Sequence, residues 1–229
     1  MEWALRNSVT KHYCQKFDPY GSFLDGAQYR ELSREYTHED LIKNILDNTL
    51  KHREPFVRDH LRSRADEVNG GVIPRYCDHT NFDRVKDLVS GLPLWAVVDS
   101  FSLGVLINFI NMCDRGTGDD QIWKLVANDF DVRHRLLGSS LSSARTLRNM
   151  VSHHQRLWMR PTPNVPAIPK KLRQLSRRVT NNSVLAPLIN ISLYQGSGEE
   201  RANYLHDLLG VAESDSNYWF GLAKVDNRA

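Results

Sequence analysis

The chain has 229 residues, of which 41% are hydrophobic and 25% are charged, and its net charge is +3. This length holds one domain, or one domain with a small appendage. The composition is that of a globular protein and excludes a disordered or fibrous chain. The three cysteines, Cys14, Cys77 and Cys113, are odd in number and form no CxxC pair, which argues against a disulfide framework and a structural zinc site. We therefore expect the protein in the reducing cytoplasm.

The sequence gives little sign of a membrane segment. Its opening residues, MEWALRNSVTKHY, contain no apolar signal-peptide core. The only long apolar stretch, Leu92 to Met112, contains Asp99, Asn108 and Asn111. We interpret it as a buried helix rather than a transmembrane span, and we expect no membrane partner.

The charges are segregated along the chain. Residues 132 to 198 contain eleven Lys and Arg residues and no Asp or Glu, so this segment carries +11 and the rest of the chain −8. Clustered Lys and Arg gain free energy from counterion release when they meet phosphates, which favours a polyanionic partner. The alternative is a basic surface that pairs with the acidic half of the same chain.

Hydrophobic residues recur at helical spacing between clusters of Gly and Pro, which predicts an all-α fold. The predicted helices cover residues 2 to 16, 38 to 51, 55 to 66, 80 to 90, 93 to 112, 119 to 128, 140 to 160, 170 to 178, 183 to 194 and 198 to 212. Helix starts are indicated by Thr37 with Asp40, by Pro93, and by Ser197 with Glu199 and Glu200.

A second domain element is predicted near the C-terminus. Four prolines between Pro161 and Pro169 indicate an extended, fairly stiff connector. Residues 1 to 161 are therefore predicted to form a helical bundle. Residues 162 to 229 are predicted to form the connector and a small appendage of helices packed on that bundle.

The predicted helix 140 to 160 has two different faces when it is projected at about 100° per residue. One arc, roughly 140° wide, holds Arg145, Arg148, Asn149, Ser152, His153, Arg156 and Arg160. The opposite arc holds Ala144, Leu147, Met150, Val151, His154, Leu157 and Trp158. No acidic residue balances the four arginines, so the first arc is a candidate phosphate site.

Several of these residues have a structural interpretation beside the functional one. His154, Leu157 and Trp158 are expected in the core. Arg156 and Arg160 either hold RNA or stabilise the negative end of the helix dipole. Asp99, within an apolar helix, needs a partner and is a candidate to orient Arg148.

Three sequence blocks resemble a known family. The residues from Arg148 to His153 match the R-polar-x3-H signature of HEPN ribonucleases, and the longer run LRNMVSHHQRLWMR resembles the LRN-xx-AHH-x-RLWNR block of the Abi-like abortive-infection proteins of bacteria, the AbiD/AbiF group. Leu92-Pro93-Leu94-Trp95, leading to Ser102-Leu103-Gly104, resembles the family's LPxW...SFG segment, and Glu2 to Arg6 resembles its E-x-x-LR segment. The resemblance covers about Met1 to Pro161, with the blocks in the family's order.

The resemblance implies a HEPN-like bundle and an abortive-infection or toxin function in phage defence. It also implies a homodimer in which two R-x4-H motifs meet at a cleft. In that family several tens of residues normally precede the E-x-x-LR helix, so we expect either a naturally short member or a fragment. A small RNA or a protein antitoxin is a possible further partner.

The residue types suit RNA cleavage without a metal or cofactor. RNA carries its own nucleophile, the 2′-hydroxyl, so the enzyme must supply a base, an acid and positive charge on the phosphorane. Histidine can serve as base or acid, and arginine binds phosphate oxygens. One histidine cannot do both at once, which favours two chains. We predict Arg148 and His153 as catalytic residues and Asn149 and Asp99 as supporting ones. Arg145, Arg156 and Arg160 are predicted to bind RNA.

Two other functions remain open from the sequence. The same helical dimer could hold a structured small RNA without cutting it, or the basic arc could meet an acidic protein. The sequence contains no HExxH motif, no phosphate-binding GxxxxGK[ST] loop, no GxGxxG and no GxSxG. Zinc-enzyme, NTPase, dinucleotide-binding and α/β-hydrolase functions therefore have no support.

Overall fold

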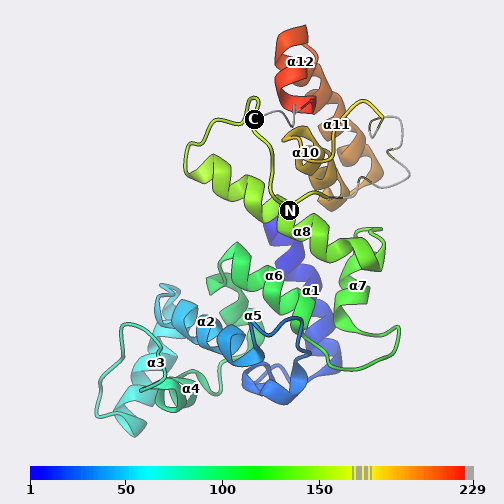
Figure 1. The fold of residues 1–229 in the computed structure, drawn as a ribbon. Helices are drawn as coiled ribbons and strands as arrows, with labels where there is room; N and C mark the ends of the chain where they lie inside the picture. The colour runs from blue at the N-terminus through cyan, green and yellow to red at the C-terminus, as the bar shows by residue number, and fades with distance from the viewer. Residues whose placement is uncertain (167, 169–171, 173–174, 176, 225–229) are drawn as a thin grey trace. The chain divides into compact units, whose positions relative to one another are not determined.

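The computed structural model describes residues 1–166, 168, 172, 175 and 177–224 (Figure 1). Their regular structure consists of α-helices and short 3-10 turns, with two isolated bridges, Tyr20 to Pro93 and Tyr29 to Cys113. The predicted all-α fold is confirmed. The chain divides into two compact units, residues 2–126 and the residues from 127 onward, and the division falls within helix α7 (Ile122–Asp129).

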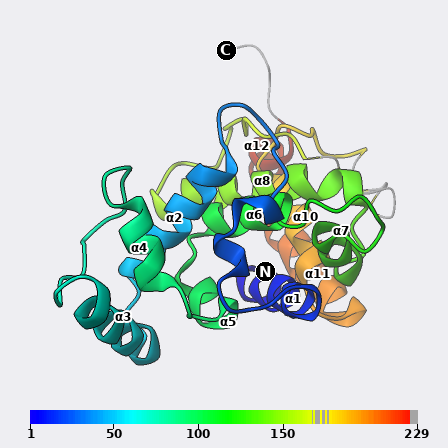
Figure 2. The same ribbon diagram turned by 90° about the horizontal axis from the view of Figure 1, so that it is seen from below.

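The N-terminal unit is built on six complete helices and the first turns of α7. These helices are α1 (Glu2–Lys16), α2 (His38–Leu50), α3 (Pro55–Val68), α4 (Phe82–Val89), α5 (Leu94–Val97) and α6 (Leu103–Met112). Helices α3 and α4 lie side by side (Figure 2), and α2 packs on both α4 and α6. Short 3-10 turns at Ser22–Leu24, Gly26–Gln28 and Val98–Ser100 connect these helices.

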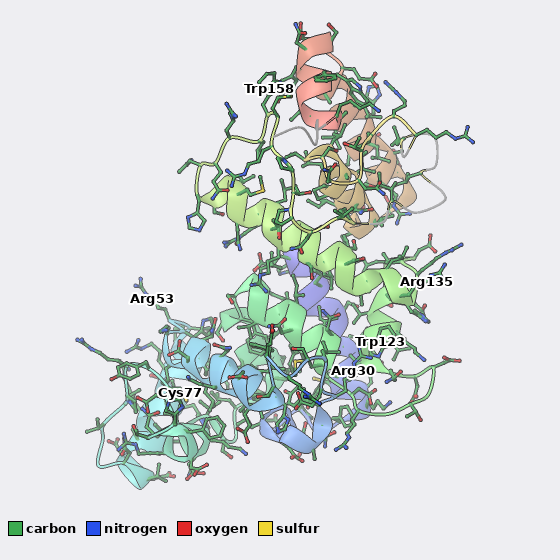
Figure 3. The ribbon with its side chains drawn as sticks, in the orientation of Figure 1. Arg30, Arg53, Cys77, Trp123, Arg135 and Trp158 are labelled. Atoms are coloured by element: carbon green, nitrogen blue, oxygen red, sulfur yellow. The ribbon has the colours of Figure 1, made fainter. Side chains whose placement is uncertain are left out.

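The core of this unit forms around α6, most of whose side chains are buried. The ring of Phe109 lies 5.5 Å from Tyr13 of α1, 6.1 Å from Tyr29 and 5.6 Å from Phe101, measured between ring centroids. At the rim, the guanidinium carbon of Arg30 lies 4.4 Å from the ring centroid of Trp123 (Figure 3). These aromatic contacts join segments far apart in the sequence and stabilise the unit beyond simple area burial.

The C-terminal unit is built on α8 (His134–Ser152), α10 (Leu185–Ile191), α11 (Gly198–Ala212) and α12 (Ser216–Ala223), with a 3-10 turn at Ser192–Tyr194. Helix α8 packs on α10, and α12 contacts both α10 and α11. The core includes Leu147 and Met150 of α8, which are buried with Leu185, Ile189 and Leu222. The Tyr194 hydroxyl donates to Ser140 Oγ at 2.9 Å, and burial raises the pKa of Tyr194 to about 12. Helix α8 is therefore held along its length by the C-terminal helices.

Most predicted helices are confirmed within a few residues, namely those at 2 to 16, 38 to 51, 55 to 66, 80 to 90, 119 to 128, 183 to 194 and 198 to 212. Thr37 and Asp40, expected at a helix start, form a capping box, and so do Ser197 and Glu200. The prediction at 170 to 178 lies largely outside the described residues. Helix α12 was not predicted, although the Asp215 carboxylate accepts from the backbone N–H groups of Asn217 and Tyr218 and so caps it.

The single helix predicted at 93 to 112 is wrong. It is broken into α5, the 3-10 turn Val98–Ser100 and α6, because Phe101 is extended and the Ser102 hydroxyl accepts from Val105 N–H to start a new helix. Asp99 lies in the turn and is exposed. A solvated carboxylate needs no partner, so the argument that Asp99 must pair with a buried cation fails.

The division between the compact units does not coincide with the domain boundary predicted between residues 161 and 162. The buried face of α8 belongs to the same core as α10 and α12, so the helix groups with the C-terminal residues. Within the proline-containing segment, Thr162 is held by contacts to Asn182. Thr162, which is buried, donates to the Asn182 carbonyl oxygen from its backbone N–H at 2.7 Å and from its hydroxyl at 3.2 Å.

Candidate functional site

The candidate catalytic residues lie where helix α8 ends. The helix was predicted over 140 to 160, but it begins at His134 and ends at Ser152. His153 is the C-cap residue, and His154 follows in the left-handed region with φ 51°. The backbone N–H of His154 donates to Val151 O at 3.0 Å, and that of Gln155 donates to Met150 O at 2.9 Å. These two bonds form a Schellman motif, which satisfies the last carbonyl groups and turns the chain away from the helix axis.

The end of α8 at Ser152 explains why two side chains that were predicted in the core are exposed. His154 was predicted in the core, but it is exposed, because the left-handed turn removes it from the apolar arc. Trp158 was also predicted in the core and is 41% exposed, while Leu157 is half-buried against the C-terminal core. The Trp158 Nε1–H donates to Asn217 O at 3.3 Å, so this side chain lies on α12 rather than inside the unit (Figure 3).

The left-handed His154 predicts a stabilising substitution. Glycine adopts positive φ without the steric penalty that a Cβ brings. We expect His154→Gly to raise the free energy of unfolding by about 1 kcal/mol. Urea unfolding of both proteins measures the difference. His154→Ala is the matched control, since it removes the imidazole and keeps the Cβ. If His154→Ala raised the free energy of unfolding as much as His154→Gly, the backbone-strain argument would be contradicted.

Arg148 and His153 are both exposed at the C-terminal end of α8. In a regular helix, residues five positions apart are separated by about 140° around the axis and about 7.5 Å along it. Neither side chain forms an ion pair or a hydrogen bond with another described residue, so both are open to a ligand. No carboxylate neutralises Arg148 within the described part of the chain, and its charge is available to bind phosphate.

The structure brings three of the predicted residues into one groove of about 410 Å³ in the C-terminal unit. Arg145 and Asn149 are one turn apart on α8, and Arg160 contributes from the segment that follows the helix. The other residues that line the groove are Ser142, Thr146, Met150, Gln155, Pro161, Pro163 and Asn164. Arg148 and His153 do not line it.

Two predicted residues lie elsewhere. Arg156 lines a second, mainly apolar pocket with Leu157, Trp158 and side chains of α10, α11 and α12. The helical projection grouped it with Arg145 and Arg148, but that grouping fails beyond Ser152, where the helix ends. Asp99 belongs to the N-terminal unit, and its role in orienting Arg148 stays a prediction.

No sequence pattern indicated Gln155, Asn164 or Thr146 as site residues. Asn164 Nδ2 donates to Thr146 Oγ1 at 2.7 Å, although the two residues are 18 positions apart. Asparagine in a proline-containing segment is a common loop residue, so only the return of the chain along α8 identifies it as part of the groove.

The described residues offer neither a metal site nor a membrane span. Across the described residues, no group of three or more His, Cys, Asp or Glu side chains is placed to hold a metal ion. No described helix combines the length and hydropathy that crossing a membrane requires.

The fold and site define an all-α protein with an exposed Arg and His at the end of a basic helix. The family model described as "Abi-like protein" matches residues 1–159, which is most of the chain. The protein therefore belongs to the Abi-like family, and this membership points to abortive infection, a form of phage defence. The search of curated proteins found no match, and the search of solved structures found none either.

Proposed function

We propose that this chain is a metal-independent endoribonuclease of the HEPN type, which acts as a homodimer in bacterial abortive infection. The observation that carries the proposal is the pair Arg148 and His153, both exposed at the end of α8 and without an acidic partner in the described residues. The pair lies within the part of the chain that the family model matches.

The two side chains supply what RNA cleavage needs. The 2′-oxygen attacks the adjacent phosphorus, so the P–O2′ bond forms while the P–O5′ bond breaks. A histidine takes the proton of the 2′-hydroxyl, and a second acid gives a proton to the leaving 5′-oxygen. Arg148 donates to the phosphorane oxygens, whose charge grows in the transition state. The products are a 2′,3′-cyclic phosphate and a 5′-hydroxyl.

A homodimer supplies the missing acid. Each chain has one histidine in the motif, and base and acid must act on opposite sides of the phosphorus at the same time. His153 of a second copy provides the other group if the two α8 ends meet at one cleft. The resemblance of the Arg148 to His153 segment to the R-x4-H signature supports this arrangement.

A non-catalytic RNA-binding dimer is the second candidate function. The observation that favours it is the groove that contains Arg145 and Arg160, which RNA binding alone would use. The exposed imidazole of His153 favours the enzyme, because binding alone has no need of a proton donor or acceptor.

The deciding experiment incubates the purified full chain with mixed single-stranded RNAs in EDTA and analyses the RNA ends. We expect cleavage in EDTA, with 2′,3′-cyclic phosphate or 3′-phosphate ends. Loss of cleavage in EDTA and its recovery with Mg²⁺ would contradict the mechanism. RNA binding without cleavage would instead support the non-catalytic dimer. The His153→Ala protein, purified in parallel, controls for contaminating ribonuclease.

A further inference from the structure

The groove beside α8 is built by the chain's return after the helix. The Schellman motif at His153 and His154 turns the chain. The segment after the helix then forms a second wall of the groove beside Arg145 and Asn149, made of Gln155, Arg160, Pro161, Pro163 and Asn164. This wall is anchored at Asn164, which donates to Thr146 of α8 at 2.7 Å, and at Thr162, whose backbone N–H donates to Asn182 O at 2.7 Å. The groove is therefore preformed, which lowers the entropy cost of binding a ligand.

The charge of the groove suits phosphate. Arg145 and Arg160 stand on its two walls, both are exposed, and no carboxylate is among the residues that line it. Neither arginine forms an ion pair within the described residues. Arginine binds phosphate oxygens through paired donors, so two unpaired guanidinium groups on facing walls favour an anion held between them.

The remaining polar groups suit a base rather than an inorganic ion. Asn149, Gln155 and Asn164 place three amides in the groove. An amide carries both donors and acceptors and can match the edge of an unpaired base. The Asn164 Nδ2 group already bonds to Thr146, which leaves its Oδ1 as an acceptor. The volume of about 410 Å³ falls within the range of roughly 300–1,000 Å³ that small-molecule sites occupy.

The groove also leads toward the proposed catalytic residue. Asn149 lines it, and His153 follows four positions later, so the two share one side of the helix end. Arg160 and Asn164 come after residues 1–159, the part that the family model matches. These two residues of the second wall therefore lie outside the matched region.

We propose that this groove binds one unpaired nucleotide of the RNA, next to the phosphate that is cleaved, and sets the base preference of the enzyme. Arg145 and Arg160 hold the phosphate of that nucleotide, while Asn149 and Asn164 contact the edge of its base. The proposal rests on the nuclease function for its place beside the cleaved phosphate, but nucleotide binding in the groove does not depend on cleavage.

The test measures binding of short single-stranded RNAs and of the four nucleoside monophosphates to the full chain over a range of salt concentrations. Arg145→Ala and Arg160→Ala should each weaken RNA binding about tenfold or more and reduce the salt slope by about 1. Arg135→Ala is the matched control. Arg135 is an exposed arginine of the first turn of α8 (Figure 3). It lines a different hollow with Asn128 and Asp131. Equal losses from Arg135→Ala would overturn the groove as a specific site.

Base preference distinguishes recognition of a nucleotide from non-specific electrostatic binding. Asn149→Ala and Asn164→Ala should reduce the difference in affinity among the four monophosphates, with little change in the salt slope. Thr146→Val removes the hydroxyl that anchors Asn164 but keeps the Asn164 amide. If Asn164→Ala loses the base preference and Thr146→Val keeps it, the Asn164 amide contacts the base. Unchanged preference in both Asn variants would refute base reading. Competition by polyglutamate as strong as that by RNA would show an acidic peptide site instead.

The two proposals fail in different ways. If the groove variants lose nucleotide binding while the wild-type chain cuts no RNA, the groove stands and the nuclease function falls. If the wild-type chain cuts RNA while Arg145→Ala and Arg160→Ala change RNA affinity no more than Arg135→Ala does, the nuclease function stands and the groove proposal falls.

Discussion

Replacing His153 with alanine is expected to slow RNA cleavage by a factor of about 10² to 10⁴ and to leave RNA affinity nearly unchanged. The imidazole moves protons in the transition state, whereas it contributes little to holding the phosphate before reaction. Single-turnover cleavage rates and equilibrium binding, both measured with the same RNA, separate the two effects.

Arg148→Ala should lower both the rate and the affinity, because the guanidinium meets the phosphate in the bound state and the phosphorane in the transition state. His154→Ala is the control for both variants, since His154 is the exposed neighbouring histidine and has no role in the proposed chemistry. A fully active His153→Ala protein would end the assignment as a nuclease.

Mixing the two inactive variants is expected to leave cleavage near the level of either variant alone. A heterodimer of Arg148→Ala and His153→Ala chains keeps a single His153 in the cleft, whereas the proposed mechanism needs one His153 as base and the other as acid. A cleft that needs only Arg148 from one copy and His153 from the other would instead regain cleavage. Cleavage assays on mixtures of varied ratio, after the subunits have been allowed to exchange, separate the two outcomes, because any recovery should be greatest near equal amounts.

This comparison requires proof that the subunits exchange. Differently tagged chains that co-purify after mixing supply it. If exchange occurs and the mixture regains cleavage, one His153 in the cleft is enough and the two-histidine mechanism fails. Sedimentation of the wild-type chain gives an independent check, since a monomer at micromolar concentration that cleaves at full rate would contradict the dimer.

Local sequence patterns determined most of the secondary structure. Helical periodicity and capping residues located α1, α2, α3 and α11 to within a few residues, because a helix depends on contacts only three or four positions apart. The spacing of Arg148 and His153 and the segregation of charge are also visible in the sequence alone. These features needed no knowledge of which segments pack together.

Helix ends and side-chain burial were decided by the tertiary structure. Periodicity alone allowed a helix to continue to residue 160 and a single helix over 93 to 112. Instead, the Schellman bonds at Gln155 and the packing of Leu157 on the C-terminal core end α8 at Ser152. The extended Phe101 breaks the helix that was predicted over 93 to 112 and leaves Asp99 in solvent. Both outcomes are competitions between local helix extension and contacts with distant residues, since Leu157 packs on the C-terminal core and the Phe101 carbonyl oxygen accepts from Arg6 Nη2 at 2.7 Å.

The candidate groove shows the same distinction. Arg145 and Asn149 follow from helical spacing, so the sequence alone placed them on one face. Arg160 and Asn164 reach that face because the chain reverses and Asn164 bonds to Thr146, a residue 18 positions away. A pattern of single residues carries no signal for such a return, because its free energy comes from hydrogen bonds and packing that exist only once the segments have met.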